Sequence, residues 1–264
     1  MKNPIITLLT DFGTKDPYVA SMKGTILNIN PQCTLVDITH HVKPHDIEEG
    51  AFVLATAYSF FPKGTIHLCV VDPGVGGPRK PLLFVTADYF FVGPDNGIFT
   101  LALQRERVKQ IVALTNPKYF LSQVSTTFHG RDLFAPVVGH LSLGVKPNAF
   151  GHQVGRWTQL AFQKPWVEGR RLIGEILHID AFGNLISNID EEYLFHFVKE
   201  NPFIIRAGKR IIRGLKKGYW EGKRDEMMAL FGSGGLLEIS VRESSAQKML
   251  KVVKGDKIIV QVTN

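Results

Sequence analysis

The sequence predicts an α/β amino-terminal domain, with a Rossmann-like layered sheet and flanking helices, over residues 1–150, and a smaller, mainly-β barrel or sandwich over residues 170–264. Three observations predict this arrangement. In the first domain, short apolar runs alternate with segments of helical spacing, as in a sheet covered by helices. Over residues 144–169, glycine, proline, tryptophan and glutamine replace this alternation, so residues 151–169 are expected to be a linker. Beyond it, β-rich runs predominate.

Two helix starts are predicted in the first domain. Asp16 and Pro17 indicate a helix with Asp16 as its N-cap and proline in the first helical position. Asp46 and Glu49 have the spacing of a capping box. The predicted strands cover residues 5–9, 34–38, 65–71, 82–87, 89–92 and 110–114, and residues 98–104 are expected to be helical.

One loop follows a buried strand directly and carries charge at both ends. It runs from Asp72 through Pro73-Gly74-Val75-Gly76-Gly77-Pro78 to Arg79. Ligand crevices of open parallel sheets lie beyond the carboxyl ends of the strands, where glycines let the backbone approach a ligand. A dinucleotide fingerprint is excluded, because the third glycine is missing and another strand follows. A plain turn that begins at Asp72 is the alternative interpretation.

A histidine stands at a predicted junction between loop and helix. His129 follows the polar residues 122–127 and precedes an apolar run of helical spacing over 134–141. This position suits acid–base or electrostatic work, and helix capping is the ordinary alternative. Upstream, the strands over 82–87 and 89–92 meet at Asp88, which leaves no room for an inserted segment.

The second domain is expected to consist of strands joined by tight turns. The first two strands are connected through Asp180-Ala181-Phe182-Gly183-Asn184, and a later connection is the glycine loop Gly232-Ser233-Gly234-Gly235. The predicted strands cover residues 172–179, 185–189, 203–207, 227–231, 236–240 and 257–262, and one helix is expected over 191–198.

The charge balance suggests a nucleic-acid surface as one alternative. The chain of 264 residues has 31 basic and 24 acidic side chains and a net charge of +7. Because no nucleic-acid motif accompanies the basic segment, a solvated surface is the favoured interpretation. The segment contains Arg206, Lys209, Arg210, Arg213, Lys216, Lys217, Lys223 and Arg224.

The cysteines and the hydropathy pattern predict a cytoplasmic protein. Cys33 and Cys69 lie among apolar neighbours, which predicts buried free thiols. No apolar run approaches the ~20 residues that span a bilayer. The amino terminus lacks the pattern of a signal peptide.

Three histidines close together raise the alternative of a metal-dependent hydrolase. His40, His41 and His45 lie near Asp37 and Asp46. Their spacing matches no standard metal motif, and Asp46 is already expected to cap a helix. Loss of activity with a chelator is the result that this alternative predicts.

Six blocks of sequence, in order along nearly the whole chain, together resemble one enzyme family. They are Leu9-Thr10-Asp11-Phe12-Gly13 with Lys23-Gly24, Val71-Asp72-Pro73-Gly74-Val75-Gly76 with Arg79, Gly93-Pro94-Asp95-Asn96-Gly97, Phe128-His129-Gly130-Arg131-Asp132, Phe182-Gly183-Asn184 and Leu237-Glu238-Ile239. The chain resembles the S-adenosyl-L-methionine hydroxide adenosyltransferases, which are relatives of the bacterial fluorinase and chlorinase. Those halogenases carry tyrosine where this chain has Asp72, and they contain an extra segment after the next strand.

The resemblance implies hydrolysis of S-adenosyl-L-methionine to adenosine and L-methionine, with water attacking the ribose 5′ carbon and no cofactor. It implies a catalytic set of Asp72, Arg79 and His129, ribose contacts from Asp11, adenine contacts from Phe182 and Asn184, and contacts to the methionine amino and carboxylate groups from Asp180 and Ser233. The halogenases carry an arginine where this chain has Gly234.

The resemblance also implies a homotrimer in which each ligand lies between the amino-terminal domain of one subunit and the carboxy-terminal domain of the next. A binding module that holds adenosine or S-adenosylmethionine without turnover is the main alternative function. The presence of Asp72, Arg79 and His129 favours the enzyme.

Overall fold

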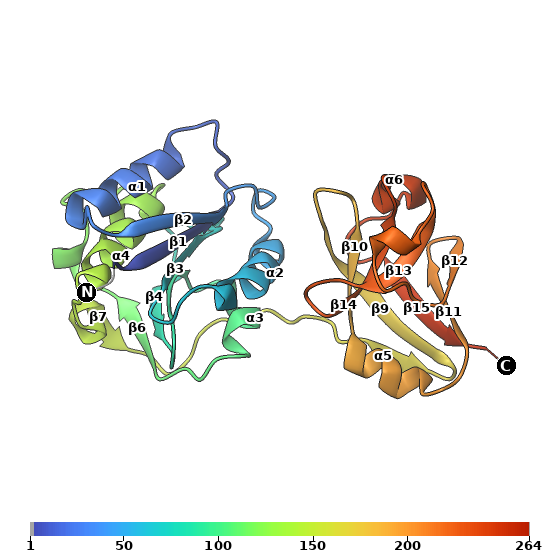
Figure 1. Ribbon diagram of the computed structural model, residues 1–264. Coiled ribbons are helices and arrows are strands. Elements are labelled where there is room, and N and C mark those ends of the chain that lie inside the picture. The colour runs from blue at the N-terminus through green and yellow to red at the C-terminus, as the bar shows by residue number, and fades with distance from the viewer. Residues whose placement is uncertain (1–2, 264) are drawn as a thin grey trace. The chain divides into compact units, whose positions relative to one another are not determined.

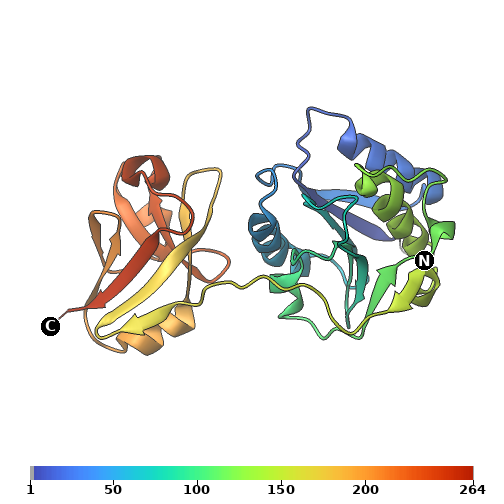
Figure 2. The ribbon, with the colours of Figure 1, turned by 180° about the vertical axis from the view of Figure 1, so that it is seen from behind.

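The computed structural model describes residues 3–263, and the chain forms two compact units that meet in the sequence between Leu160 and Ala161. Figures 1 and 2 show each unit from opposite sides. The stretch expected to be a linker, residues 151–169, contains a strand of each unit. Strand β7 (Gly151–Gln153) pairs with the first sheet and β8 (Trp166–Glu168) with the second.

The first unit contains a seven-stranded mixed sheet in the order β2-β1-β3-β5-β4-β6-β7. Strands β2, β1, β3 and β5 are parallel, whereas β4, β6 and β7 run antiparallel to their neighbours. The carboxyl ends of β1 and β3 therefore lie side by side at one edge. The strands are β1 (Ile5–Thr10), β2 (Thr34–Thr39), β3 (Ile66–Val70), β4 (Pro81–Val85), β5 (Phe90–Pro94), β6 (Gln110–Leu114) and β7.

Helices cover both faces of this sheet, as Figure 1 shows. Ile6 and Leu8 of β1 pack with α1 (Tyr18–Ile29) and α4 (Ala135–Ser142). Leu9 faces the opposite core, with α2 (Ile47–Ala57) and α3 (Thr100–Leu103). The layered α/β arrangement predicted from the sequence is thus present. Short 3₁₀ turns occur at Tyr58–Phe60, Pro117–Tyr119 and Pro147–Phe150.

One predicted helix cap is correct and one is wrong. The Asp46 carboxylate accepts a hydrogen bond from the Glu49 backbone N–H at 2.9 Å, and it caps α2 as expected. Asp16 does not cap α1, because Pro17 takes the N-cap position and the helix begins at Tyr18. The proline therefore lies one residue earlier relative to the helix than the sequence pattern suggested.

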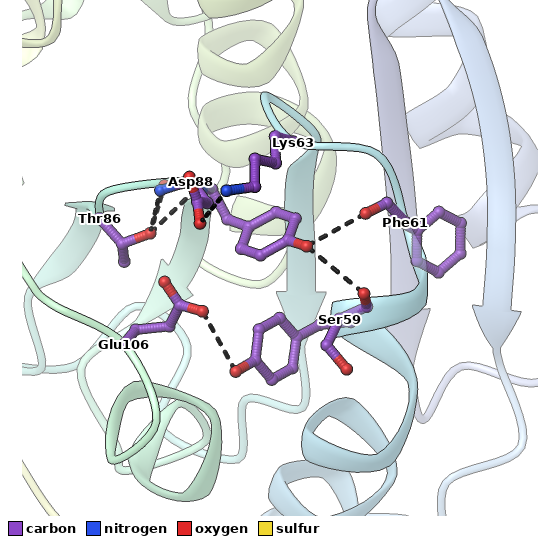
Figure 3. A network of polar contacts seen from close by, with 8 residues as sticks. Ser59, Phe61, Lys63, Thr86, Asp88 and Glu106 are labelled. Atoms are coloured by element: carbon purple, nitrogen blue, oxygen red, sulfur yellow. Dashed lines mark hydrogen bonds and ion pairs between the residues drawn. The ribbon is translucent and has the colours of Figure 1, made fainter.

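A polar network ties the end of α2 to the turn between β4 and β5 (Figure 3). The Tyr58 hydroxyl donates to Glu106 at 3.2 Å, and the Tyr89 hydroxyl donates to the backbone oxygen of Phe61 at 3.1 Å. Burial and the neighbouring Glu106 carboxylate raise the pKa of Tyr58 to about 12. Lys63 pairs with Asp88 at 3.0 Å. The network therefore joins the segment that precedes β3 to the turn between β4 and β5 and to the segment after α3.

The second unit is an almost closed β-barrel around an apolar core. Its strand order is β12-β11-β15-β9-β10-β14-β13, and β8 pairs with β9. The first half of β9 pairs with β15 and its second half with β10, which bends the sheet around the core. The elements are β9 (Arg171–Ile179), β10 (Leu185–Asp190), α5 (Glu191–Val198), β11 (Phe203–Ala207), β12 (Arg210–Arg213), a 3₁₀ turn at Tyr219–Glu221, β13 (Met227–Phe231), β14 (Leu236–Val241), α6 (Ala246–Leu250) and β15 (Lys257–Val262).

The barrel is left open between β12 and β13, the two ends of the strand order. The Lys216 backbone N–H bonds to the Ala229 oxygen at 2.8 Å just beyond β12. A hollow of about 270 Å³ lies at this seam, and Arg213, Lys216 and Glu226 are among its lining residues. Lys216 approaches Glu226 to 3.6 Å, so part of the local basic charge is paired.

Two further expectations concern the cysteines and the apolar segments. Cys33 and Cys69 are free and buried, as predicted. Over residues 3–263, no helix is both long enough and apolar enough to cross a membrane.

The difference between the two predicted caps is open to a direct test. We expect Asp46→Ala to lower the free energy of unfolding by about 1 kcal/mol, because a helix N-terminal N–H loses its acceptor. The matched Asp16→Ala variant should change it by less than about 0.5 kcal/mol, because an exposed side chain without a capping bond is removed. Urea denaturation followed by circular dichroism measures both, and equal losses would contradict the assignment.

Candidate active site

The loop after β3 is folded by its own backbone into consecutive turns. The Val75 N–H bonds to the Asp72 oxygen at 3.2 Å, and the Gly77 N–H bonds to the Gly74 oxygen at 3.0 Å. The simple turn that begins at Asp72 is therefore present. It does not exclude a functional role, because the Asp72 side chain remains available for other contacts.

Gly76 brings this loop against the segment that carries His129. Its φ is +75°, a left-handed conformation that glycine adopts without strain. A Cβ atom at this position would lie 2.2 Å from the Thr126 backbone oxygen. Only glycine therefore permits this close approach of the two loops.

Arg79 joins Asp72 to His129 in one contiguous set. Its Nε lies 3.1 and 3.0 Å from the two Asp72 carboxylate oxygens, and its Nη2 lies 2.6 Å from Oδ2. The same Nη2 lies 2.8 Å from His129 Nδ1. The side chains of Arg79 and Asp72 are only 9% and 4% exposed, so this is a buried ion pair. The guanidinium also lies over the Phe134 ring, 5.5 Å from its centroid.

A π-helical turn places His129. The turn covers Gly130–Phe134, directly before α4, and His129 occupies its N-cap position. π-helical turns are rare and frequently occur at functional sites. The buried Asp132 carboxylate holds the turn by accepting from the Ser125 backbone N–H at 2.9 Å and from Arg131 Nε at 2.6 Å. Asp132 thus fixes the loop before His129, a role that the sequence analysis did not assign.

The surroundings of His129 favour its neutral form. Burial lowers the pKa of His129, and the Arg79 guanidinium lowers it further, although the Asp72 and Asp132 carboxylates oppose this effect. An arginine N–H donates and cannot accept, so His129 Nδ1 is the acceptor in its contact with Arg79. The neutral ring then carries its proton on Nε2 and presents a donor there.

Asp11 lies at the same edge of the sheet as Asp72. Thr10 of β1 pairs with Val70 of β3, so both carboxylates follow the carboxyl ends of neighbouring parallel strands. Asp11 Oδ2 accepts the His45 backbone N–H at 2.9 Å. The alternative role of Asp11, as the cap of the following helix, is not what the structure has, because Pro17 is the N-cap of α1.

The remaining predicted residues lie in the second unit, on two turns. Asp180 organises the turn between β9 and β10: its Oδ1 accepts the backbone N–H groups of Phe182 and Asn184, each at 2.9 Å, and its Oδ2 accepts the Asn184 amide at 2.9 Å. Phe182 projects from this turn with 78% of its surface exposed. Ser233 is exposed on the loop between β13 and β14. The first unit thus holds Asp11, Asp72, Arg79 and His129, and the second unit holds the others.

The three histidines of the metal alternative lie in different surroundings. His40 is buried and its two ring nitrogens lie close to Thr10 and Asp37, whereas His41 and His45 are exposed. Across residues 3–263, no group of three or more His, Cys, Asp or Glu side chains is arranged to hold a metal ion.

These features define a two-domain α/β and β-barrel protein with a contiguous Asp–Arg–His set beside a glycine loop. Residues 6–151 match the family model of the SAM hydroxide adenosyltransferase N-terminal domain, and residues 174–259 match that of the C-terminal domain. The chain therefore belongs to the SAM hydroxide adenosyltransferase family.

Similar proteins cover almost the full length of the chain. A Salinispora tropica protein named (R)-S-adenosyl-L-methionine hydrolase is 40% identical over 260 residues, which span 97% of this chain and 97% of the relative. A Methanocaldococcus jannaschii protein of the same name is 37% identical over 265 residues, which span 96% and 94%. The crystal structure of an uncharacterized conserved protein from Thermotoga maritima has a TM-score of 0.91 and 35% identity, and covers 97% of this chain and 99% of that one.

The electrostatic coupling of Arg79 to His129 predicts a measurable change in titration. We expect Arg79→Met to raise the pKa of His129, because the cation is removed while the Asp72 carboxylate remains nearby. Histidine side-chain NMR over a pH series measures the change. The titration of His140, whose pKa is lowered by burial and by Lys118, serves as the control and should stay the same. A lower or unchanged pKa at His129 would contradict the assigned contact.

Proposed function

We propose that this protein hydrolyses S-adenosyl-L-methionine to adenosine and L-methionine. The observation that carries the proposal is the contiguous Asp72–Arg79–His129 set, with its ion pair buried, in a chain of this family. The names of its full-length relatives support the same substrate. Water attacks the ribose 5′ carbon, the C5′–S bond breaks, and its electron pair goes to sulfur. The sulfonium becomes the neutral thioether of methionine, and the proton of the attacking water passes to solvent.

In this mechanism the protein acts on the nucleophile. Bulk water has a pKa near 15.7 and is a poor nucleophile at neutral pH. The Arg79 cation stabilises developing hydroxide character, and His129 donates a hydrogen bond from Nε2 to the same oxygen. Asp72 keeps both oxygens on Arg79 and fixes its orientation. We thus assign His129 an electrostatic and orienting role instead of that of a general base.

The binding residues divide between recognition of the nucleoside and recognition of the amino acid. Asp11 accepts hydrogen bonds from the two ribose hydroxyls. The His45 N–H, which donates to Asp11 Oδ2, orients the carboxylate. Phe182 offers an exposed ring for stacking on adenine, and Asn184 contacts the edge of the adenine base. Asp180 and Ser233 meet the methionine amino and carboxylate groups.

The reaction needs no cofactor. The thioether leaves as a neutral group, so neither a general acid nor a Lewis acid is required for its departure. We expect the purified protein, incubated with S-adenosylmethionine, to release adenosine and methionine in equal amounts, with the same rate in the presence of a chelator. Chromatography of both products tests this. Binding by calorimetry without any product would instead support a binding module, and loss of activity with chelator would support a metal-dependent hydrolase.

Variants of the Asp72–Arg79–His129 set test the assignment of its members. Asp72→Ala and His129→Ala should each lower kcat by about two orders of magnitude or more, as expected for loss of a positioned charge or proton partner. His41→Ala serves as the matched control, since this histidine is exposed and lies outside the set. Circular dichroism verifies that each variant is folded. Turnover near the wild-type rate in Asp72→Ala or His129→Ala would mean that the set is misassigned.

We further propose that the protein is a cytoplasmic homotrimer, in which the ligand contacts residues from two subunits. The distribution of the predicted residues over two separate units is compatible with a site shared in this way. Light scattering coupled to size-exclusion chromatography should give about three times the 29.5 kDa chain mass. A fully active monomer would refute the shared site.

A further inference from the structure

A series of polar side chains next to Asp11 in the sequence and the fold has no part in the mechanism so far. Its members are Thr10, His40, Asp37 and Lys23. Thr10 is fully buried and His40 is 4% exposed. Thr10 Oγ1 lies 2.9 Å from His40 Nδ1, and His40 Nε2 lies 3.0 Å from Asp37 Oδ1. Asp37 Oδ2 lies 2.6 Å from Lys23 Nζ. This polar series therefore connects α1, β2 and the loop after β2 to the last residue of β1.

The hydrogen-bond donors and acceptors of this polar series can be assigned without conflict. The Phe12 backbone N–H donates to Thr10 Oγ1 at 3.3 Å. The Thr10 hydroxyl then donates to His40 Nδ1, so the neutral ring carries its proton on Nε2. That N–H faces the acceptor-only Asp37 carboxylate. The Nε2–Oδ1 distance is 3.0 Å, so this N–H lies beside the negative charge of Asp37.

Asp37 is held in its charged form by its neighbours. Burial alone would raise the pKa of Asp37, but the neighbouring Lys23 and His40 side chains outweigh this effect and lower the pKa below its usual range. A permanent carboxylate at this place fixes the tautomer of His40, as carboxylates do for functional histidines. The Lys23 ammonium balances the negative charge of Asp37.

The same loop supports the residues around Asp11 at two further points. The Gly13 N–H bonds to the His40 backbone oxygen at 2.7 Å, and the His45 N–H bonds to Asp11 Oδ2 at 2.9 Å. His45 has φ +69°, a left-handed conformation that is uncommon for a residue with a side chain. Together with the Thr10 contact, these bonds hold the backbone on both sides of Asp11.

A register irregularity aims the loop at β1. Leu8 pairs with Asp37 and Leu9 pairs with Thr39, so Ile38 is an extra residue in β2. Such bulges redirect a strand and are frequent beside active sites. This bulge lies between Asp37 of β2 and His40 of the following loop, which both belong to the polar series.

We propose that His40 is a positioning residue, which acts through Thr10 and the backbone of residues 10–13 to present the Asp11 carboxylate to the vicinal hydroxyls of a ribose. The inference rests on the proposed function, because it takes the ribose of the substrate as the ligand of Asp11. It assigns His40 to ligand recognition and not to a metal site or to the chemical step.

The test compares adenosine with 2′,3′-dideoxyadenosine, which lacks the two hydroxyls. Isothermal titration calorimetry on the full chain gives Kd for each. We expect the wild type to prefer adenosine by about tenfold or more, because two charge-assisted hydrogen bonds to Asp11 are lost with the analogue. His40→Ala and Thr10→Val should reduce this preference to about twofold or less. His41→Ala, an exposed neighbour of the same type, should keep it.

A double-mutant cycle separates positioning from general loss of stability. Asp11→Ala should abolish the preference, and addition of His40→Ala to Asp11→Ala should change neither affinity further. His40→Asn places an amide where Nδ1 lies and should retain more of the preference than His40→Gln, whose amide reaches toward Asp37 instead. A merely structural role would weaken both ligands equally in His40→Ala and leave the preference intact, which would overturn the inference.

Failure of the inference is distinguishable from failure of the proposed function. Wild-type release of adenosine and methionine, combined with an unchanged preference in His40→Ala and Thr10→Val, would refute only the positioning role. A wild type that neither binds adenosine nor converts S-adenosylmethionine would refute the proposed function, and the positioning role with it.

Discussion

The structure of the candidate site depends on a single buried cation. The Arg79 guanidinium has only 9% of its side chain exposed, and it is paired with both oxygens of Asp72 and with His129 Nδ1. Removal of one partner of a buried pair costs about 3–5 kcal/mol, because the remaining charge stays unpaired. Asp72 and Arg79 are close in sequence, so the loop between them must fold back on itself. His129 comes from a distant part of the chain, so Gly76 must let the two loops approach. The turns between Asp72 and Arg79 thus serve the ion pair, and Gly76 and the π-helical turn serve the approach of His129 to it.

A second feature is common to three carboxylates of the two units: backbone N–H groups fix their orientation. Asp11 accepts from His45, Asp132 accepts from Ser125, and Asp180 accepts from Phe182 and Asn184. An acceptor oriented in this way loses little freedom when a ligand arrives, so less of the binding free energy is spent on ordering the site. Rigid positioning is also what a nucleophilic displacement requires, since the attacking oxygen must be held in line with the bond that breaks.

The sequence predicted the elements that long apolar runs define, and missed those that depend on distant contacts. The runs in β3, β6, β11, β13 and β15 and in helix α5 were placed within a residue of their observed bounds. Strands β7, β8 and β12 were missed, because they are short and lie mostly at the surface. The local pattern raises His40 as a candidate metal ligand, whereas its ring contacts Thr10, 30 residues away. The contact of Arg79 with His129, 50 residues apart, likewise could not follow from local pattern, and only the resemblance to a family placed the two residues in one set.

The neutral charge of the departing thioether explains why Asp72, Arg79 and His129 can form most of their hydrogen bonds with one another. A sulfonium that departs as a thioether takes no proton, so this site has no need of an acid held in reserve. Asp72 can therefore give both oxygens to Arg79, and His129 can give Nδ1 to the same guanidinium, without depriving the reaction of a proton donor. What remains directed at the nucleophile is the positive charge of Arg79 and one imidazole N–H. The proposed chemistry thus requires a precise electrostatic environment more than proton transfer, and in a site of that kind the residues that hold other residues in place, such as Asp132 and His40, are as necessary as those that face the substrate.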